Sequence, residues 1–187
     1  MQSPFSFIVR PVKGRRYDNI KEIGGIDFIT SASKEDYVAS NRFGEVISLP
    51  INYTGDVKIG DILLVHHNVF KFYYDMYGKE KSGKSYFRED MFLVDEDQFF
   101  LYFQHGKWTA YSKYCFIKPV KAKESFLGKT GKEEPLIGTV KYINKELIAL
   151  GVKEGDEISY VPDSDYEFKI NEEKLYRMYT SNITMIL

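Results

Sequence analysis

One stretch of sequence occurs twice in this chain, and this internal repeat constrains the fold more than any other feature. Residues 44–65 read GEVISLPINYTGDVKIGDILLV, and residues 138–160 read GTVKYINKELIALGVKEGDEISY. In both copies a glycine opens an apolar stretch, the turn sequence V-K-x-G-D follows, and a second apolar stretch ends the copy. The first glycine precedes the glycine of the turn by 16 residues in one copy (Gly44, Gly60) and by 17 in the other (Gly138, Gly155). The repeat predicts two modules of related structure.

The similarity continues on the N-terminal side of each copy. Residues 7–13, FIVRPVK, are typical of a first strand, and residues 116–121, FIKPVK, share its Phe-Ile start and its Pro-Val-Lys end. We therefore expect one module over residues 1–115 and a shorter one over residues 116–187, meeting near Cys115. Short apolar stretches separated by Gly, Asn and Asp, without a sustained helical period, favour an all-β fold, as barrel or sandwich. Residues 144–150 are the exception, since they could form one or two helical turns.

The composition indicates a soluble, cytoplasmic protein. Lys and Arg number 26 and Asp and Glu 27, so the net charge of −1 gives no reason to expect nucleic acid or an anionic membrane as a partner. The single cysteine, Cys115, rules out an intrachain disulfide and a cysteine-based zinc site, and it suits a reducing compartment. No apolar run is long enough to span a membrane, and the N-terminus lacks the pattern of a signal peptide.

The two copies contain an ordered series of short motifs. They are Arg10-Pro11, Gly24-Gly25-Ile26, Gly44-Glu45-Val46, Val57-Lys58-Ile59-Gly60-Asp61-Ile62, Gly138, Val140 and residues 152–156. This series resembles that of the GroES co-chaperonin family, whose members are irregular β-barrels that close the folding chamber of a chaperonin ring. The resemblance implies two tandem GroES-like irregular β-barrel modules with little helix, a chaperonin ring as partner, and assembly of this chain into a homo-oligomeric ring. It implies no catalytic residue and no cofactor.

In that family a mobile loop after the first strand carries a short apolar segment behind Gly-Gly, which docks into a groove of the chaperonin. The matching loop here is residues 15–42. The resemblance implies that Gly24, Gly25, Ile26, Phe28 and Ile29 form the chaperonin-binding segment. From strand periodicity alone, the favoured alternative is that the three apolar residues belong to an ordinary strand of the barrel.

The sequence also departs from the family pattern. Asp27 interrupts the apolar segment, and the second module has Phe126-Leu127 in its loop without Gly-Gly-Ile. The turn at residues 52–55 is too short for the family's roof hairpin, and an insertion at residues 76–90 is foreign to the family. This divergence suggests a phage-type relative, or a non-catalytic structural or assembly protein, such as one of a virion, that reuses the fold. An oligosaccharide- or nucleic-acid-binding barrel is a third, weaker alternative.

Two further patterns imitate functional sites. Residues 78–85, GKEKSGKS, match the P-loop expression G-x-x-x-x-G-K-[ST]. A P-loop requires a helix after its Ser or Thr, and the next apolar stretch, residues 91–94, leaves no room for one, so we expect a charged hairpin tip without tight ATP binding. His66 and His67 are adjacent, so within a strand they would face opposite sides and could not chelate one metal ion. We therefore expect no metal site.

Overall fold

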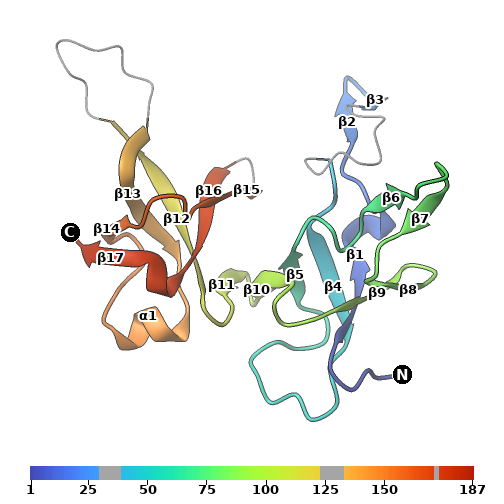
Figure 1. Cartoon of the computed structure of the whole chain (residues 1–187), viewed down its shortest axis with the longest axis horizontal. Coiled ribbons are helices and arrows are strands. Elements are labelled where there is room, and N and C mark those ends of the chain that lie inside the picture. The colour runs from blue at the N-terminus through green and yellow to red at the C-terminus, as the bar shows by residue number, and fades with distance from the viewer. Residues whose placement is uncertain (30–38, 123–132, 171–172) are drawn as a thin grey trace. The chain divides into compact units, whose positions relative to one another are not determined.

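A computed structural model describes residues 1–29, 39–122, 133–170 and 173–187 (Figure 1). In these residues β-strands predominate and the single α-helix has five residues, so the prediction of an all-β fold with little helix is confirmed. The chain divides into two compact units, Met1–Gly106 and Lys107–Leu187. The sequence predicts the boundary at Cys115 instead, because the detectable similarity between the copies begins only at Phe116.

The first unit contains a main sheet and two separate two-stranded sheets, β2-β3 and β6-β7. Within the unit the main sheet has the strand order β10-β5-β4-β1-β9-β8. The elements are β1 (Phe7–Pro11), the 3-10 turn η1 (Val12–Gly14), β2 (Ile20–Ile23), β3 (Ile26–Ile29), β4 (Phe43–Ser48), β5 (Ile62–Val65), β6 (Phe72–Tyr74), β7 (Glu80–Ser82), β8 (Tyr86–Arg88), β9 (Met91–Val94) and β10 (Phe99–Gln104).

The second unit has a six-stranded sheet of order β15-β16-β12-β13-β14-β17. The elements are β11 (Lys107–Ala110), β12 (Tyr114–Lys121), β13 (Glu133–Tyr142), the helix α1 (Lys145–Ala149), β14 (Glu157–Tyr160), β15 (Tyr166–Ile170), β16 (Glu173–Tyr179), the 3-10 turn η2 (Thr180–Asn182) and β17 (Ile183–Ile186). The loop residues Phe126 and Leu127 lie outside the described part of the chain.

The two main sheets have the same topology. Read in the same direction, β8-β9-β1-β4-β5-β10 of the first unit corresponds strand for strand to β15-β16-β12-β13-β14-β17 of the second. In the described residues neither sheet closes on itself, since β8 is not paired with β10, nor β15 with β17. The sheets are therefore open, and the expectation of closed barrels is not met, because closure would require ladder hydrogen bonds between those end strands.

The register of the central strand pair repeats as well. Pro11 of β1 lies opposite Gly44 of β4, and Pro119 of β12 lies opposite Gly138 of β13. In both pairs the register shifts between the second and third residues before the proline. A Cβ atom on Gly44 would lie 3.0 Å from Cζ of Phe70, and one on Gly138 would overlap the side chain of Ile117. Close packing over the sheet therefore explains why a glycine opens each copy.

The V-K-x-G-D segments form the same turn in both units. The aspartate carboxylate accepts the backbone N–H of the lysine three residues earlier, at 2.7 Å for Asp61 and 2.8 Å for Asp156. Gly60 and Gly155 have φ values of +89° and +96°, a region that glycine enters without steric cost. The repeated sequence therefore encodes one turn geometry, which leads into β5 in the first unit and into β14 in the second.

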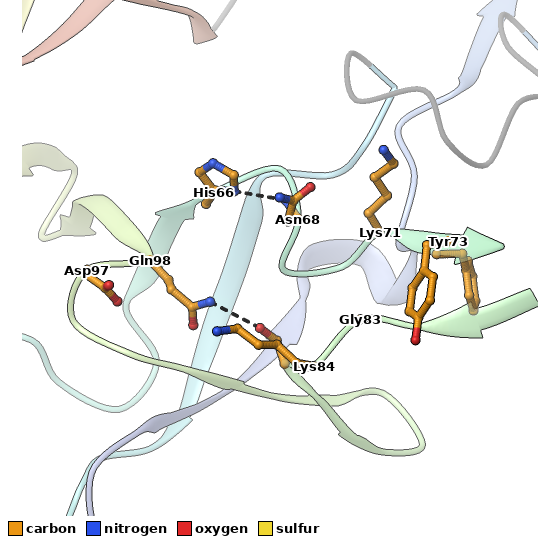
Figure 2. Close-up of a pocket in the computed structure, with 10 residues that line it drawn as sticks. His66, Asn68, Lys71, Tyr73, Gly83, Lys84, Asp97 and Gln98 are labelled. Atoms are coloured by element: carbon orange, nitrogen blue, oxygen red, sulfur yellow. Dashed lines mark hydrogen bonds between the residues drawn. The ribbon is translucent and has the colours of Figure 1, made fainter. Parts of the chain in front are cut away.

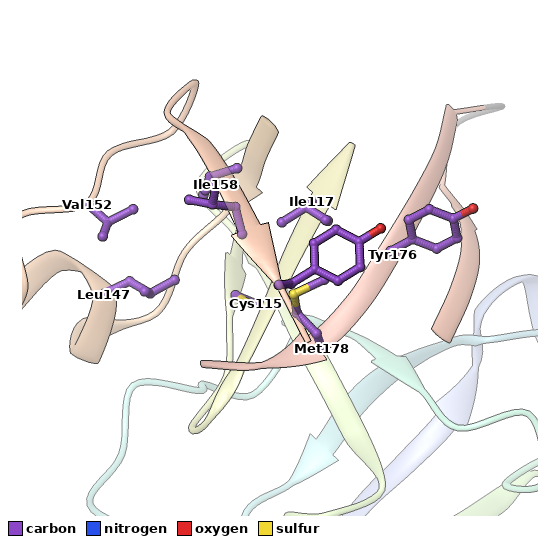
Figure 3. Packing of buried hydrophobic residues seen from close by; sticks show 9 residues of the cluster. Cys115, Ile117, Leu147, Val152, Ile158, Tyr176 and Met178 are labelled. Carbon is purple, nitrogen blue, oxygen red and sulfur yellow. The ribbon is translucent and has the colours of Figure 1, made fainter. Parts of the chain in front are cut away.

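The helix α1 completes the core of the second unit. Its N-cap, Asn144, accepts the N–H of Leu147 at 2.9 Å and donates to Thr180 Oγ1 at 2.7 Å, so this buried amide is well bonded. The cap places Leu147 in the apolar cluster shown in Figure 3. The other members of this cluster are Cys115, Ile117, Val140, Val152, Ile158, Tyr160, Tyr176 and Met178. Cys115 is buried as expected, and burial raises the pKa of its thiol to about 12.

Candidate functional site

The predicted docking segment lies in a two-stranded hairpin that stands apart from the main sheet (Figure 1). Strands β2 and β3 pair antiparallel, with Ile20 opposite Ile29. Gly24 and Gly25 form the turn, with φ values of +62° and +81°. Two successive residues with positive φ are typical of the tight hairpin turns that match the twist of antiparallel strands, and glycine suits both positions. The Gly-Gly pair therefore closes the hairpin and determines its register.

Three large apolar side chains of this hairpin are exposed. Ile26 exposes 62% of its surface, Phe28 48% and Ile29 71%. They form a strand, as their periodicity indicates, but in the described residues this strand pairs only with β2 and belongs to no main sheet. Exposed apolar residues gathered over four positions are a common property of protein-binding segments.

The root of the hairpin is fixed to the first unit. Asp18 N–H donates to the carbonyl of Ala39 at 2.8 Å, and Asn41 N–H donates to the carbonyl of Arg16 at 3.0 Å. The buried side-chain amide of Asn41 also donates to the carbonyl of Arg15 at 2.7 Å. These bonds hold both ends of the predicted loop, residues 15–42, against each other. Residues 30–38 of that loop lie outside the described residues.

Arg16 and Tyr17 join this root to the insertion. The Arg16 guanidinium donates to the carbonyl of Phe70 at 2.6 Å and to Ser82 Oγ at 3.0 Å, and it lies 3.5 Å from the centroid of the Phe72 ring. The hydroxyl of Tyr17 accepts the N–H of Phe72 at 2.8 Å. Burial lowers the pKa of Arg16 from its usual range. These partners are 54 to 66 residues away in sequence, so no local sequence signal indicates this junction.

Residues 78–85, which match the P-loop expression, lack the structural context of a P-loop. Asp75 caps the turn between β6 and β7 by accepting the N–H groups of Tyr77 and Lys79 at 2.9 and 3.0 Å. The residues directly after Ser85 form strand β8. A P-loop holds phosphate with the N-terminal amides of the helix that follows it, and here a strand replaces that helix. The segment is therefore part of a hairpin, as the sequence predicts, but Glu80 and Lys81 lie on strand β7 and the tip carries the exposed Met76 and Tyr77.

A pocket of about 460 Å³ lies beside the insertion (Figure 2). Its polar wall includes Ser85, whose hydroxyl accepts from Gln98 Nε2 at 3.4 Å, and Asn68, whose N–H donates to His66 Nδ1 at 3.2 Å. Its other lining residues are Lys71, Phe72, Tyr73, Gly83, Lys84 and Asp97. These residues come from the turn after β5, from the insertion and from the turn before β10, so the insertion completes the pocket.

The two adjacent histidines differ from their predicted arrangement. They follow β5 instead of lying within it, and the rings of His66 and His67 are 4.1 Å apart, so the expectation that they face opposite sides is wrong. Burial, with a smaller contribution from His66, lowers the pKa of His67 to about 4. Across the described ranges of the chain, no three His, Cys, Asp or Glu side chains come together as a metal site.

No protein-family model matches the sequence, and no curated protein matches it either. Within the described part of the chain, no helix has the length and apolar character needed to cross a membrane.

Proposed function

We propose that this chain is a non-catalytic co-chaperonin of the GroES type, made of two tandem modules and acting in the cytoplasm. Copies of the chain assemble into a ring that caps a chaperonin and assists protein folding. The observation that carries the proposal is the exposure of three apolar side chains of strand β3, Ile26 and Phe28 on one face of the hairpin and Ile29 on the other. Further support comes from the shared topology and register of the two units, because the motifs that resemble the family occur at equivalent places in both.

The energetics of docking favour this hairpin as an anchor. Each large apolar side chain contributes on the order of 1.5–3 kcal/mol when it becomes fully buried. Ordering a flexible segment costs roughly 1–2 kcal/mol per residue, so a hairpin whose strands are already paired loses less on binding. Several weak anchors on one ring then reinforce one another through effective concentration. Under these conditions we expect three side chains per copy to be sufficient for docking.

The proposal is tested by mixing the full-length protein with a GroEL-type chaperonin and nucleotide and measuring co-elution by size-exclusion chromatography. We expect the wild-type protein to co-elute and Phe28→Ser to lose the complex. Phe5→Ser is the matched control, since Phe5 is 83% exposed in the same unit but lies outside the hairpin. Both variants should keep the wild-type urea midpoint, because neither side chain is buried. Absence of a wild-type complex, or equal loss in both variants, would refute the docking role.

A structural or assembly role without a chaperonin is the second candidate function, and the insertion favours it. Its tip residues Met76 and Tyr77 are 88% and 87% exposed, which is a large apolar surface for a segment foreign to the family. Under this alternative self-association depends on the insertion, so Tyr77→Ser should weaken it, whereas the co-chaperonin ring does not require the insertion and should persist in this variant. Analytical ultracentrifugation of the wild-type protein and Tyr77→Ser separates the two functions.

A further inference from the structure

We propose that the pocket beside the β6–β7 hairpin binds an acidic peptide segment of a partner protein. Lys71 precedes β6 and Lys84 lies in the insertion between β7 and β8, so two separate segments of the chain each contribute a lysine to the pocket lining (Figure 2). The capping role proposed above does not require this site. It would serve a second contact, with chemistry different from that of the apolar docking hairpin.

The charge of the insertion favours an anionic ligand. The insertion, residues 76–90, contains four basic and three acidic residues, and Lys71 adds a positive charge just before it, in a chain whose net charge is −1. In the described residues, neither the Lys71 nor the Lys84 ammonium forms an ion pair with a carboxylate, although other lysines do, such as Lys81 with Asp75 at 3.1 Å. Among the pocket residues Asp97 is the only acid, so the lining has an excess of positive charge.

The aromatic wall of the pocket favours a peptide over a small inorganic anion. Phe72 and the exposed Tyr73 line the same cavity as the lysines and offer apolar contact area. A peptide with alternating acidic and apolar side chains uses both the lysines and the rings, whereas phosphate uses only the charges and hydrogen-bond donors. The volume of about 460 Å³ accommodates a few side chains.

The insertion is also held firmly enough to keep the pocket in place. The Arg16 guanidinium bonds to Ser82 Oγ on β7 and to the carbonyl of Phe70, and it stacks on Phe72. Phe72 is itself a lining residue, so this cation–π contact fixes one wall of the pocket. A preorganised wall lowers the entropic cost of binding a ligand.

The test is fluorescence anisotropy with the full-length protein and a fluorescein-labelled peptide of sequence EFEEFE, with KFKKFK as the charge-reversed control. We expect saturable binding of the acidic peptide alone, weakened about tenfold by Lys84→Glu and again by Lys71→Glu, because each reversal replaces an attraction with a repulsion. Lys79→Glu is the matched control, since it makes the same charge change at the tip of the same hairpin but outside the pocket. It should weaken binding about twofold or less, because Lys79 does not line the pocket and solvent-exposed charges that make no direct contact interact weakly. Lys84→Gln, with circular dichroism to confirm folding, should give an intermediate loss.

Three results would overturn the proposal. One is no binding of EFEEFE to the wild-type protein, and another is an equal effect of Lys79→Glu and Lys84→Glu, which would indicate only general charge attraction. The third is displacement of the peptide by inorganic phosphate at equal concentration, which would indicate a small-anion site. Phe28→Ser should leave peptide binding unchanged. A negative result in the peptide-binding experiment therefore does not affect the co-chaperonin proposal. A negative result in the chaperonin co-elution experiment does not affect the proposed peptide site.

Discussion

The repeated turn offers an internal comparison, because its two aspartates have the same role in different surroundings. Asp61 is buried, and its carboxylate accepts the N–H of Lys58 at 2.7 Å and Gln104 Nε2 at 3.0 Å. Asp156 is half-buried, and its carboxylate accepts the N–H of Lys153 at 2.8 Å. Hydrogen bonds to charged groups contribute about 1.5–3 kcal/mol each when buried and less when exposed. We therefore expect Asp61→Ala to lower the free energy of unfolding by about 3 kcal/mol and Asp156→Ala by about 1 kcal/mol.

Urea unfolding followed by far-UV circular dichroism measures the total loss, and hydrogen exchange with mass spectrometry assigns it to a unit. Faster exchange should appear in peptides over residues 44–65 for Asp61→Ala and over residues 138–160 for Asp156→Ala. Glu96→Ala is a suitable control, because Glu96 is an exposed carboxylate in another turn and should change stability by less than about 0.5 kcal/mol. Equal losses for the two aspartate variants, or faster exchange in the wrong unit, would refute this account of the turns.

Three further variants test other parts of the first and second units. Arg16→Lys removes the guanidinium fork from Ser82 Oγ and the Phe70 carbonyl, so hydrogen exchange over residues 71–82 should rise while exchange over β4 stays unchanged. The pKa of His67 is about 4 in the folded protein and 6.5 for an ordinary histidine. As the pH drops from 6.5 toward 4, His67 is protonated in the unfolded chain before it is protonated in the folded one, so the free energy of unfolding falls. His67→Gln should therefore flatten the decline of the urea midpoint between pH 7 and pH 5, and an unchanged slope would contradict this assignment. Gly138→Ala should cost about 1–3 kcal/mol through overpacking against Ile117, detectable as a lower melting temperature.

The repeat made much of the fold predictable because its signals are local. A glycine with positive φ, an aspartate that caps the turn and two flanking apolar stretches lie within a few residues of one another, so the turns ending at Asp61 and Asp156 follow from sequence alone. The short helix after Asn144 was predictable for the same reason. The open form of the sheets could not be predicted from the sequence. Closure of the first sheet depends on ladder pairing between β8 and β10, and the sequences of these strands do not specify a partner.

The candidate site was predictable only in part. Gly24 and Gly25 indicate a tight turn, and the apolar residues after them indicate a strand, but periodicity assigns such a strand to the core. That β3 pairs with β2 alone and remains exposed depends on the tertiary arrangement. The same applies to Arg16, whose partners on the insertion are distant in sequence. The adjacent histidines were assigned wrongly because β5 ends at Val65, one residue before them.

Because the β1–β4 and β12–β13 pairs share one register and one bulge, backbone hydrogen bonding alone cannot distinguish β4 from β13 as the partner of β1. A chain that refolds from denaturant presents both candidates at once, which opens a route to exchange of strands between the two halves. A ribosome presents them in sequence, and Met1–Gly106 is contiguous, so the first sheet can form before β13 has been synthesised. Refolding yield from urea should therefore be lower than yield during synthesis, and it should recover when the two halves refold as separate chains.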